Sequence, residues 1–426
     1  MQPLGTSRSF DGIILSALLF CSGCATVDEK NEDVGGISLS ISAAEQSQID
    51  NFIANHIDPS TIVASIQTSD AMVDCVDALE QPALRHLREK TGLAFDHLQP
   101  PPDLSELTNE PVDPGTEQTA AATWQPKLGK LRDVPRCPDG TVAIRRLTRQ
   151  EIAEYGSLDA YLHRAPPSTN SYEYARRGYN AYSRGIDANI SLYNPTIGTG
   201  VTHSIAQVWL AGGTGANLET VEAGIIRRSN SKNAEIFIFA TNDNYGGGTC
   251  STSTSCCWNA DCGFVIYPGT PWVLGNTFSA YATPGAATQF QARFNVYKNS
   301  DTGEWIFAFN GTAIGYWDPN YFSADNSGIR RRSDQEHVGG EVNAVNTPPH
   351  SATDMGSGAF ASSSYPNVAF ANQIKYRSIS NSWYRMPDNV GFATDSGCYS
   401  RATADNDASW GNYLFFGGPG FSASCP

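Results

Sequence analysis

The sequence predicts an all-β domain, an antiparallel β-sandwich of two sheets, preceded by a smaller and mostly helical segment. Three observations indicate this. From about residue 170 onward, short runs of alternating apolar and polar residues are separated by Gly, Asn, Asp and Pro. Charged residues make up only 17% of the chain while Gly and aromatic residues are abundant, which favours a β-rich exported protein. Upstream of residue 100, apolar residues recur at helical spacing instead.

Residues 1–24 predict an export signal. Its apolar stretch, Ile13–Phe20, follows a single basic residue, Arg8, and is too short to span a membrane. The stretch leads into CSGC, which resembles a bacterial lipobox with Cys24 as the residue that carries the lipid. We therefore expect a secreted, extracellular protein, either free or anchored as a lipoprotein to the outside of a bacterial membrane.

Residues 26–98 predict mostly helices. Ser42 and Glu45 stand in capping-box spacing at the start of one of them. Its apolar stripe consists of Ile49, Phe52 and Ile53. DAMVDCVDALEQPALRHL continues the helical pattern, a Pro-rich segment typical of a linker or a processing site follows, and Thr148 begins a further helix in LTRQEIAEY.

The clearest strand is TQFQARFNVYK. Phe290, Ala292, Phe294 and Val296 face one way and polar residues face the other. NSDTG at 299–303 then leads into EWIFAFN, which is a hairpin signal. Many short strands at this spacing, with no helical pattern between them, indicate the sandwich.

Two glutamates stand out after residue 200. Glu222, in LETVEAGII, has the small same-face neighbours Thr220 and Gly224. Glu341, in HVGGEVNAV, follows two glycines, and glycine inside a strand marks a bulge or a close approach. Two such glutamates would line a trough; the alternative is that both are ordinary solvated residues. The other four glutamates of this region are assigned to turns, loops and strand ends: Glu219, Glu235, Glu304 and Glu336.

A series of short motifs runs through the chain in one order: AQVWLAGG, VEAGI, CGFV, TGEWIF, GYW, GGEVNAV, MGSGAF, WGNYLFFGGPG and the terminal CP. With these motifs the chain resembles the neprosin family of glutamic peptidases. Upstream, DCVDALEQPALRHL resembles the activation peptide of that family, and CPDGTVAIRR resembles the segment that follows it. The resemblance implies an export signal at 1–24, an activation propeptide with its linker at 25–135, a connecting segment at 136–169 and a catalytic β-sandwich at 170–426.

The resemblance also implies an endopeptidase made as a zymogen, with Glu222 and Glu341 as the catalytic pair and the propeptide as inhibitor. The glycines before Glu341 would leave room for the substrate backbone. Gln207 matches a family position and is a candidate oxyanion donor. Plant relatives imply cleavage next to proline. They carry Trp after EAG and before GGE, whereas this chain has Ile225 and Val338 there, so the preference stays open.

Eight cysteines remain once Cys21 is removed with the signal and Cys24 carries lipid, and they can pair in an oxidising compartment. A bridge between Cys75 and Cys137 would span the linker. Cys262 matches a family cysteine, and the resemblance implies a C-terminal bridge between Cys398 and Cys425. CSTSTSCCWNADC, which contains Cys250, predicts a disulfide-pinned loop whose pairing stays open.

Two carboxyl groups that lie close together hold one proton between them over a range of pH. The ionised member takes a proton from water, and the protonated member polarises the peptide carbonyl or protonates the leaving nitrogen. We therefore expect peptide or protein substrates, hydrolysis at acid pH, and no cofactor or metal. Acid would also release the propeptide, because paired carboxylates such as Asp74, Asp77 or Glu80 lose their charge.

Other classes of function fit less well. The net charge of −15 argues against a nucleic-acid partner, and we expect a monomer. His350 with Asp354, or His337 with Glu341, imitates metal-ligand spacing, but there is no HExxH. The competing class is a carbohydrate-binding or glycoside-hydrolysing sandwich that uses the same two glutamates. The segment that resembles an activation peptide favours the peptidase, because a lectin needs none.

Overall fold

The computed structural model describes residues 41–104, 125–162, 171–247, 256–261, 263–323, 328–344 and 350–425. By its internal contacts the chain divides into Met1–Val34 and Gly35–Pro426, and all described elements belong to the second unit. Within the described ranges, no helix has the length and apolar character needed to cross a bilayer. Cys24, Cys250 and Cys262 lie outside the described residues.

The N-terminal region combines four helices with a small antiparallel sheet in the order β1-β2-β4. The predicted helical character is confirmed in part, but DAMVDCVDALEQ is not one helix, because Met72–Asp77 forms a central strand. A short apolar run cannot be told from a buried helix by its periodicity alone, and pairing with strands on both sides decides here. The elements are α1 (Ala43–His56), β1 (Ile62–Gln67), β2 (Met72–Asp77), α2 (Pro82–Thr91), β4 (Thr141–Arg145), α3 (Arg149–Ala153) and α4 (Leu158–Leu162).

Two of these helices begin where the sequence predicts. Ser42 caps α1 by accepting a hydrogen bond from the Glu45 amide at 3.1 Å. The Glu45 carboxylate accepts from the Leu158 amide at 2.6 Å and so ties α1 to α4. Thr148 and Glu151 form a complete capping box at α3.

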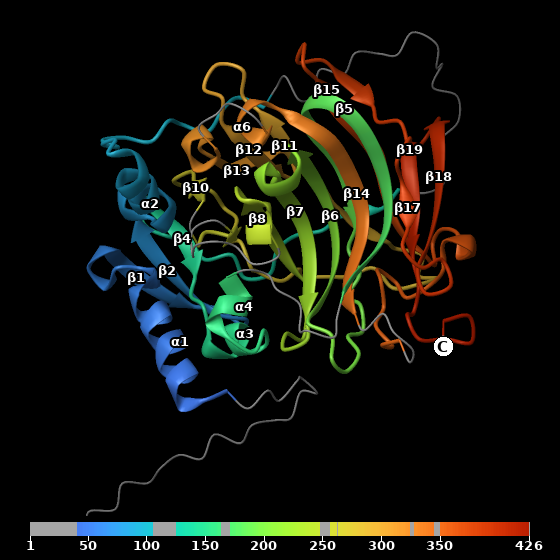
Figure 1. Cartoon of the computed structure of the whole chain (residues 1–426), viewed down its shortest axis with the longest axis horizontal. Coiled ribbons are helices and arrows are strands. Elements are labelled where there is room, and N and C mark those ends of the chain that lie inside the picture. Colours follow the sequence, from blue (N-terminus) through green and yellow to red (C-terminus); the bar gives the residue numbers. More distant parts are fainter. Residues whose placement is uncertain are drawn as a thin grey trace, which may run out of the picture. The chain divides into compact units, whose positions relative to one another are not determined.

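The expected antiparallel β-sandwich is confirmed, and its two layers are continuous through one long strand, β5 (Ser171–Ser191). Residues 171–183 of β5 pair with β14 in the first layer, and residues 185–191 pair with β11 in the second. Figure 1 shows β5 curving from one layer into the other. The first layer runs β5-β14-β6-β7-β8-β9, with β6 (His203–Gly212), β7 (Glu219–Arg228), β8 (Glu235–Thr241), β9 (Cys256–Trp258) and β14 (Ser333–Ala344).

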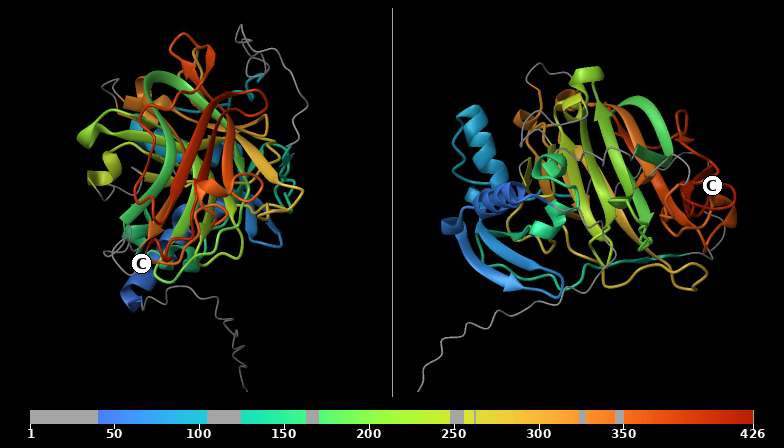
Figure 2. Two further views of the ribbon diagram at one scale, coloured as in Figure 1. Left: turned by 90° about the vertical axis from the view of Figure 1, so that its right-hand side faces the viewer. Right: turned by 60° about the horizontal axis from the view of Figure 1, so that its bottom comes forward.

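The second layer lies on the other side of the main core. Figure 2 shows its C-terminal strands, in red, when Figure 1 is turned by 90°. All of its strand pairs are antiparallel except the pairing of β3 with β11. The remaining elements are β3 (Lys127–Leu128), β10 (Phe264–Ile266), β11 (Phe290–Lys298), β12 (Trp305–Phe309), β13 (Thr312–Trp317), β15 (Ala369–Ser378), β16 (Trp383–Arg385), β17 (Phe392–Ala393), β18 (Ser400–Asp407) and β19 (Gly411–Gly417), with the short helices α5 (Asn244–Gly247) and α6 (Gly328–Arg331).

The strand pattern read from the sequence is largely confirmed. β11 and β12 form the expected hairpin, with Lys298 opposite Trp305. Glu219 and Glu336, however, are not in a loop or before a strand. Each lies within a strand and is fully buried. Burial raises the pKa of Glu336 to about 8. Because glutamate is rarely fully buried, the local sequence gave no reason to place Glu336 inside a strand.

Candidate active site

Three polar side chains lie in a diagonal row on one face of the first layer. Antiparallel pairing sets Glu341 of β14 opposite Ile205 of β6, and Glu222 of β7 opposite Trp209 of β6. Gln207 lies midway between those two positions on β6. Because directly paired residues share a face, all three side chains leave the same side of the sheet. Diagonal neighbours on paired strands are about 7–8 Å apart between Cα atoms, so Gln207 is near both glutamates.

The structure brings Gln207 and Glu341 into direct contact. The Gln207 amide Nε2 donates to Glu341 Oε2 at 3.1 Å. On the other carboxylate oxygen, Oε1, the ring atom Nε2 of His203 lies 3.9 Å away. Gln207 and Glu341 are only 1% and 4% exposed, and Gln207 Oε1 is buried without a hydrogen-bond partner among the described residues. That oxygen can accept from a water molecule or from a substrate N–H.

Glu222 lies on the far side of Gln207 and has hydroxyl partners of its own. Thr220 Oγ1 donates to Glu222 Oε1 at 3.0 Å, and the Tyr245 hydroxyl donates to the same oxygen at 2.7 Å. The Tyr245 ring stacks on Phe239, the register partner of Glu222, with centroids 6.0 Å apart. Tyr245, on α5, was missed by the sequence reasoning. It is 23 positions from Glu222 in a Gly-rich stretch that matches no motif.

The two glycines before Glu341 do not leave the open space that the sequence suggested. A Cβ on Gly339 would stand 2.7 Å from the Arg176 Cα. One on Gly340 would overlap the Met355 side chain and stand 2.9 Å from the ring of Phe416, on β19 of the second layer. Gly339 also has φ +153°, which side chains rarely adopt. These glycines therefore let β14 pack tightly between β5 and the second layer, and so fix the position of Glu341.

The N-terminal region packs on the same face of the sheet, at the end that β8 and β9 form (Figure 1). One buried cluster combines residues of α1, α3 and α4 with the register partners of both glutamates, Ile205 and Phe239. Polar contacts reinforce it: Trp258 Nε1 donates to the Tyr161 carbonyl at 3.2 Å. The remaining members of the cluster are Ile49, Ile152, Tyr155, Ile226 and Phe237.

A second contact lies between α2 and the edge strand β10. The Gln81 side chain donates to the Ile266 carbonyl at 3.2 Å and accepts from the Ile266 amide at 2.7 Å. Lys90 Nζ donates to the Tyr321 carbonyl at 2.7 Å. Hydrogen bonds to backbone groups therefore hold α2 on the sandwich.

The titratable groups between the N-terminal region and the sandwich have shifted pKa values. Burial and then Arg85 lower the pKa of His56, the last residue of α1, to about 4. Burial raises the pKa of Glu154 to about 7, and its carboxylate accepts from the Ser229 amide at 2.7 Å. Burial also raises the pKa of Asp261 to about 7. At this interface, burial therefore favours the neutral form of the histidine and the protonated form of the two carboxyl groups.

The sequence suggested three carboxylates whose protonation would release the propeptide, but their partners lie within the N-terminal region. Asp74 pairs with Arg146, and Glu80 with Arg88, all four within the N-terminal region. Asp77 accepts from the Leu79 amide at 2.9 Å. None of these three contacts reaches the β-sandwich, so the expectation that they control docking is not supported by their partners.

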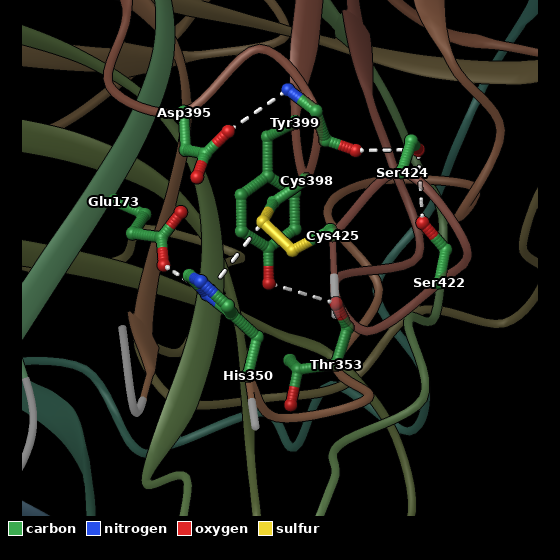
Figure 3. The surroundings of a disulfide bond; sticks show 10 residues. Glu173, His350, Thr353, Asp395, Cys398, Tyr399, Ser422, Ser424 and Cys425 are labelled. Carbon is green, nitrogen blue, oxygen red and sulfur yellow. Dashed lines mark hydrogen bonds and ion pairs between the residues drawn. A yellow bond between two sulfur atoms is a disulfide. The ribbon is translucent and has the colours of Figure 1, made fainter. Parts of the chain in front are cut away.

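The disulfides Cys75–Cys137 and Cys398–Cys425 are both formed. Figure 3 shows the second with His350 beside it: His350 Nδ1 lies 3.5 Å from Cys398 Sγ and 3.5 Å from Glu173 Oε1. Both sulfurs are committed to the disulfide, so neither is a thiolate ligand for a metal. The sequence spacing also offered Asp354 as a metal ligand together with His350. The Asp354 carboxylate accepts a hydrogen bond from the Thr196 amide at 3.1 Å.

Comparison with known proteins gives a match to a family model and weak similarities to solved structures. The family model described as Neprosin matches residues 201–419. The solved structures similar to this chain include scytalido-glutamic peptidase with a transition-state analog inhibitor, at 6% identity and TM-score 0.30, covering 59% of this chain and 99% of that one. A second structure of that peptidase, with a peptide-based transition-state analog, has 8% identity and TM-score 0.29 and covers 59% and 98%.

Proposed function

The chain belongs to the neprosin family, whose model matches just over half of its length, and on this premise we propose that it is a glutamic endopeptidase made as a zymogen and active at acid pH. One observation carries the proposal: Glu341, Gln207 and Glu222 form a buried row on one face of three neighbouring strands. A row of two carboxyl groups around an amide can move protons without a metal or a covalent intermediate.

In the proposed reaction the attacking water lies beside Gln207. The side-chain carbonyl oxygen of Gln207 accepts a hydrogen bond from the water, while the side-chain NH₂ group of Gln207 donates to Glu341 and holds it in place. One glutamate takes a proton from the water, and the other protonates the leaving nitrogen. The second N–H of the Gln207 amide remains as a donor for the carbonyl oxygen as negative charge develops there.

Burial of the row supports the zymogen part of the proposal. Glu222 is 2% exposed and Gln207 1% in the full chain, so a peptide cannot reach them there. The helices α1, α3 and α4 pack against the register partners of both glutamates. Removal of these helices would open the face from the end that β8 and β9 form.

The remaining parts of the proposal concern substrate and location. Tyr174 and Trp209 lie partly exposed on the same face, 6.3 Å apart, and such rings can pack against a proline beside the scissile bond. The disulfides Cys75–Cys137 and Cys398–Cys425 and the apolar N-terminal stretch support export, with Cys24 as a lipid anchor.

The test is digestion of a peptide library, read by mass spectrometry, with the acid-incubated full chain and its variants. Glu222→Gln and Glu341→Gln each keep the shape of the side chain and should lower kcat/KM by roughly 10³-fold or more. Glu304→Gln, at the start of the β12 hairpin strand, is the matched control and should cleave normally.

The glutamic mechanism would be contradicted by near-normal turnover in either folded variant. It would also be contradicted by complete inhibition with a metal chelator. Hydrolysis of oligosaccharides with no cleavage of any peptide would instead favour the carbohydrate-active alternative.

A further inference from the structure

Directly paired residues on four neighbouring strands form a line across the candidate site that includes Gln207. Arg176 of β5 stands opposite Gly339 of β14, Gly339 opposite Gln207, and Gln207 opposite Gly224 of β7. Since directly paired residues share a face, Arg176 lies on the same face as the two glutamates. Two strand spacings of about 4.8 Å separate it from Gln207.

The guanidinium of Arg176 is held by aromatic rings. Its central carbon lies 4.3 Å from the Phe392 ring centroid and 5.6 Å from that of Trp209. Nη1 lies against His337 Nδ1. His337 Nε2 lies 3.2 Å from Gln335 Oε1, so the tautomer with the proton on Nε2 satisfies both contacts. Arg176 is therefore fixed in orientation before any ligand arrives.

Among the described residues, no carboxylate forms an ion pair with the Arg176 guanidinium. Two neighbours favour its charged form, Tyr174 and then Asp388, and the Asp388 carboxylate is itself paired with Arg401 and accepts from Thr403 at 3.2 Å. Burial lowers the pKa of Arg176 to about 10, which leaves it charged at neutral and acid pH. A half-buried cation without a counter-charge is costly, and a carboxylate from a ligand would remove that cost.

We propose that Arg176 is a specificity-determining residue that binds a substrate carboxylate about three residues from the scissile bond. The distance follows from two strand spacings, roughly 10 Å, and about 3.3 Å per extended residue. The carboxylate comes from an acidic side chain or from the C-terminus of the peptide. The neighbouring rings of Tyr174, Trp209 and Phe392 would contact the substrate chain between that carboxylate and the bond. This inference rests on the proposed peptidase function.

The test uses one peptide that the acid-incubated full chain cleaves, remade in matched pairs. In one arm Glu replaces Gln at each position within three residues of the bond, and in the other a free C-terminus replaces an amide. At a pH above the carboxyl pKa of about 4.3, one carboxylate position should raise kcat/KM by roughly 10- to 100-fold. The arm that responds identifies the source of the carboxylate.

Arg176→Gln should bring that ratio to about one and leave the neutral peptide within about threefold of the parent. Arg176→Lys should keep part of the ratio, because it keeps the charge without the planar fork. Arg332→Gln, which also removes a guanidinium stacked on a ring, that of Tyr182, is the control and should keep the full ratio.

The proposal is overturned if the parent shows no carboxylate preference at any position or terminus, or if the preference survives in Arg176→Gln. Cleavage of peptides without a carboxylate preference would contradict the role of Arg176 and leave the proposed peptidase function intact. Failure to cleave any peptide would instead overturn the proposed function on which it rests.

Discussion

His56 Nε2 lies 3.4 Å from Asp261 Oδ1, and this contact joins the end of α1 to the turn after β9. Tyr161 of α4 donates to the other oxygen of Asp261 at 3.0 Å. Three elements thus meet at one buried carboxyl group. Below about pH 7 that group is protonated and gives no charge to a protonated His56. An imidazolium at this place would therefore be buried without compensation.

His56→Gln should stabilise the docked chain in acid and not at neutral pH. Since burial lowers the pKa of His56 from 6.5 to about 4, the neutral imidazole contributes stability above 6.5 that is lost as the pH falls towards 4. The full loss is on the order of 3 kcal/mol. Thermal unfolding in a Glu341→Gln background, which prevents self-cleavage, should show a higher Tm for His56→Gln at about pH 5. His97→Gln, an exposed control, should show no change, and an equal rise at neutral pH would contradict the assignment.

Glu154→Gln should do the opposite. Burial raises the pKa of Glu154 to about 7, so its contribution is present below its ordinary value of 4.5 and is lost as the pH rises through 7. Gln imitates the protonated form at every pH. The same unfolding measurement should therefore give a higher Tm for Glu154→Gln at about pH 8 and no difference at about pH 4. Glu89→Gln, on the exposed side of α2, is the control. A gain limited to acid would refute this reading.

Activation should require a cut after Leu162. A cut between residues 105 and 124 would leave β2 and β4 paired and linked by Cys75–Cys137, with α3 and α4 still on the site face. A cut between residues 163 and 170 would separate the whole N-terminal region from β5. After acid incubation, a gel without reductant should show two separate fragments only in active samples. Activity in a sample cut solely within 105–124 would contradict this.

Gln207→Ala should lower kcat by roughly 10- to 10³-fold, because the variant lacks both the donor to Glu341 and the buried carbonyl oxygen. KM should change less. If Gln207 acts through Glu341, adding Gln207→Ala to Glu341→Gln should lower kcat little further, since the effects of substituting residues that act as a unit are not additive. Gln291→Ala, an amide in the second layer, is the control. Multiplicative losses in the double variant would show independent roles.

Local sequence was sufficient for the parts of the site that depend on strand periodicity. Alternation placed Glu222 beside Thr220 and Gly224, and register confirms that these three share a face. Caps at Ser42 and Thr148 were readable because each uses a partner three residues away. The motifs identified Gln207 by its position in the chain, but not its bond to Glu341, which is 134 positions away.

The sequence by itself determined the antiparallel strands, the helix starts and the small residues that flank each glutamate on its own strand, because each of these follows from interactions within a few residues. Only the tertiary structure decided that Met72–Asp77 is a strand, that Tyr245 covers Glu222 and that Arg176 shares a row with Gln207. It also decided that β5 and the side chains of Met355 and Phe416 occupy the space beside the glycines before Glu341. The physical reason is register: which strands pair, and at which residue, depends on the burial of whole faces, and no local stretch encodes it.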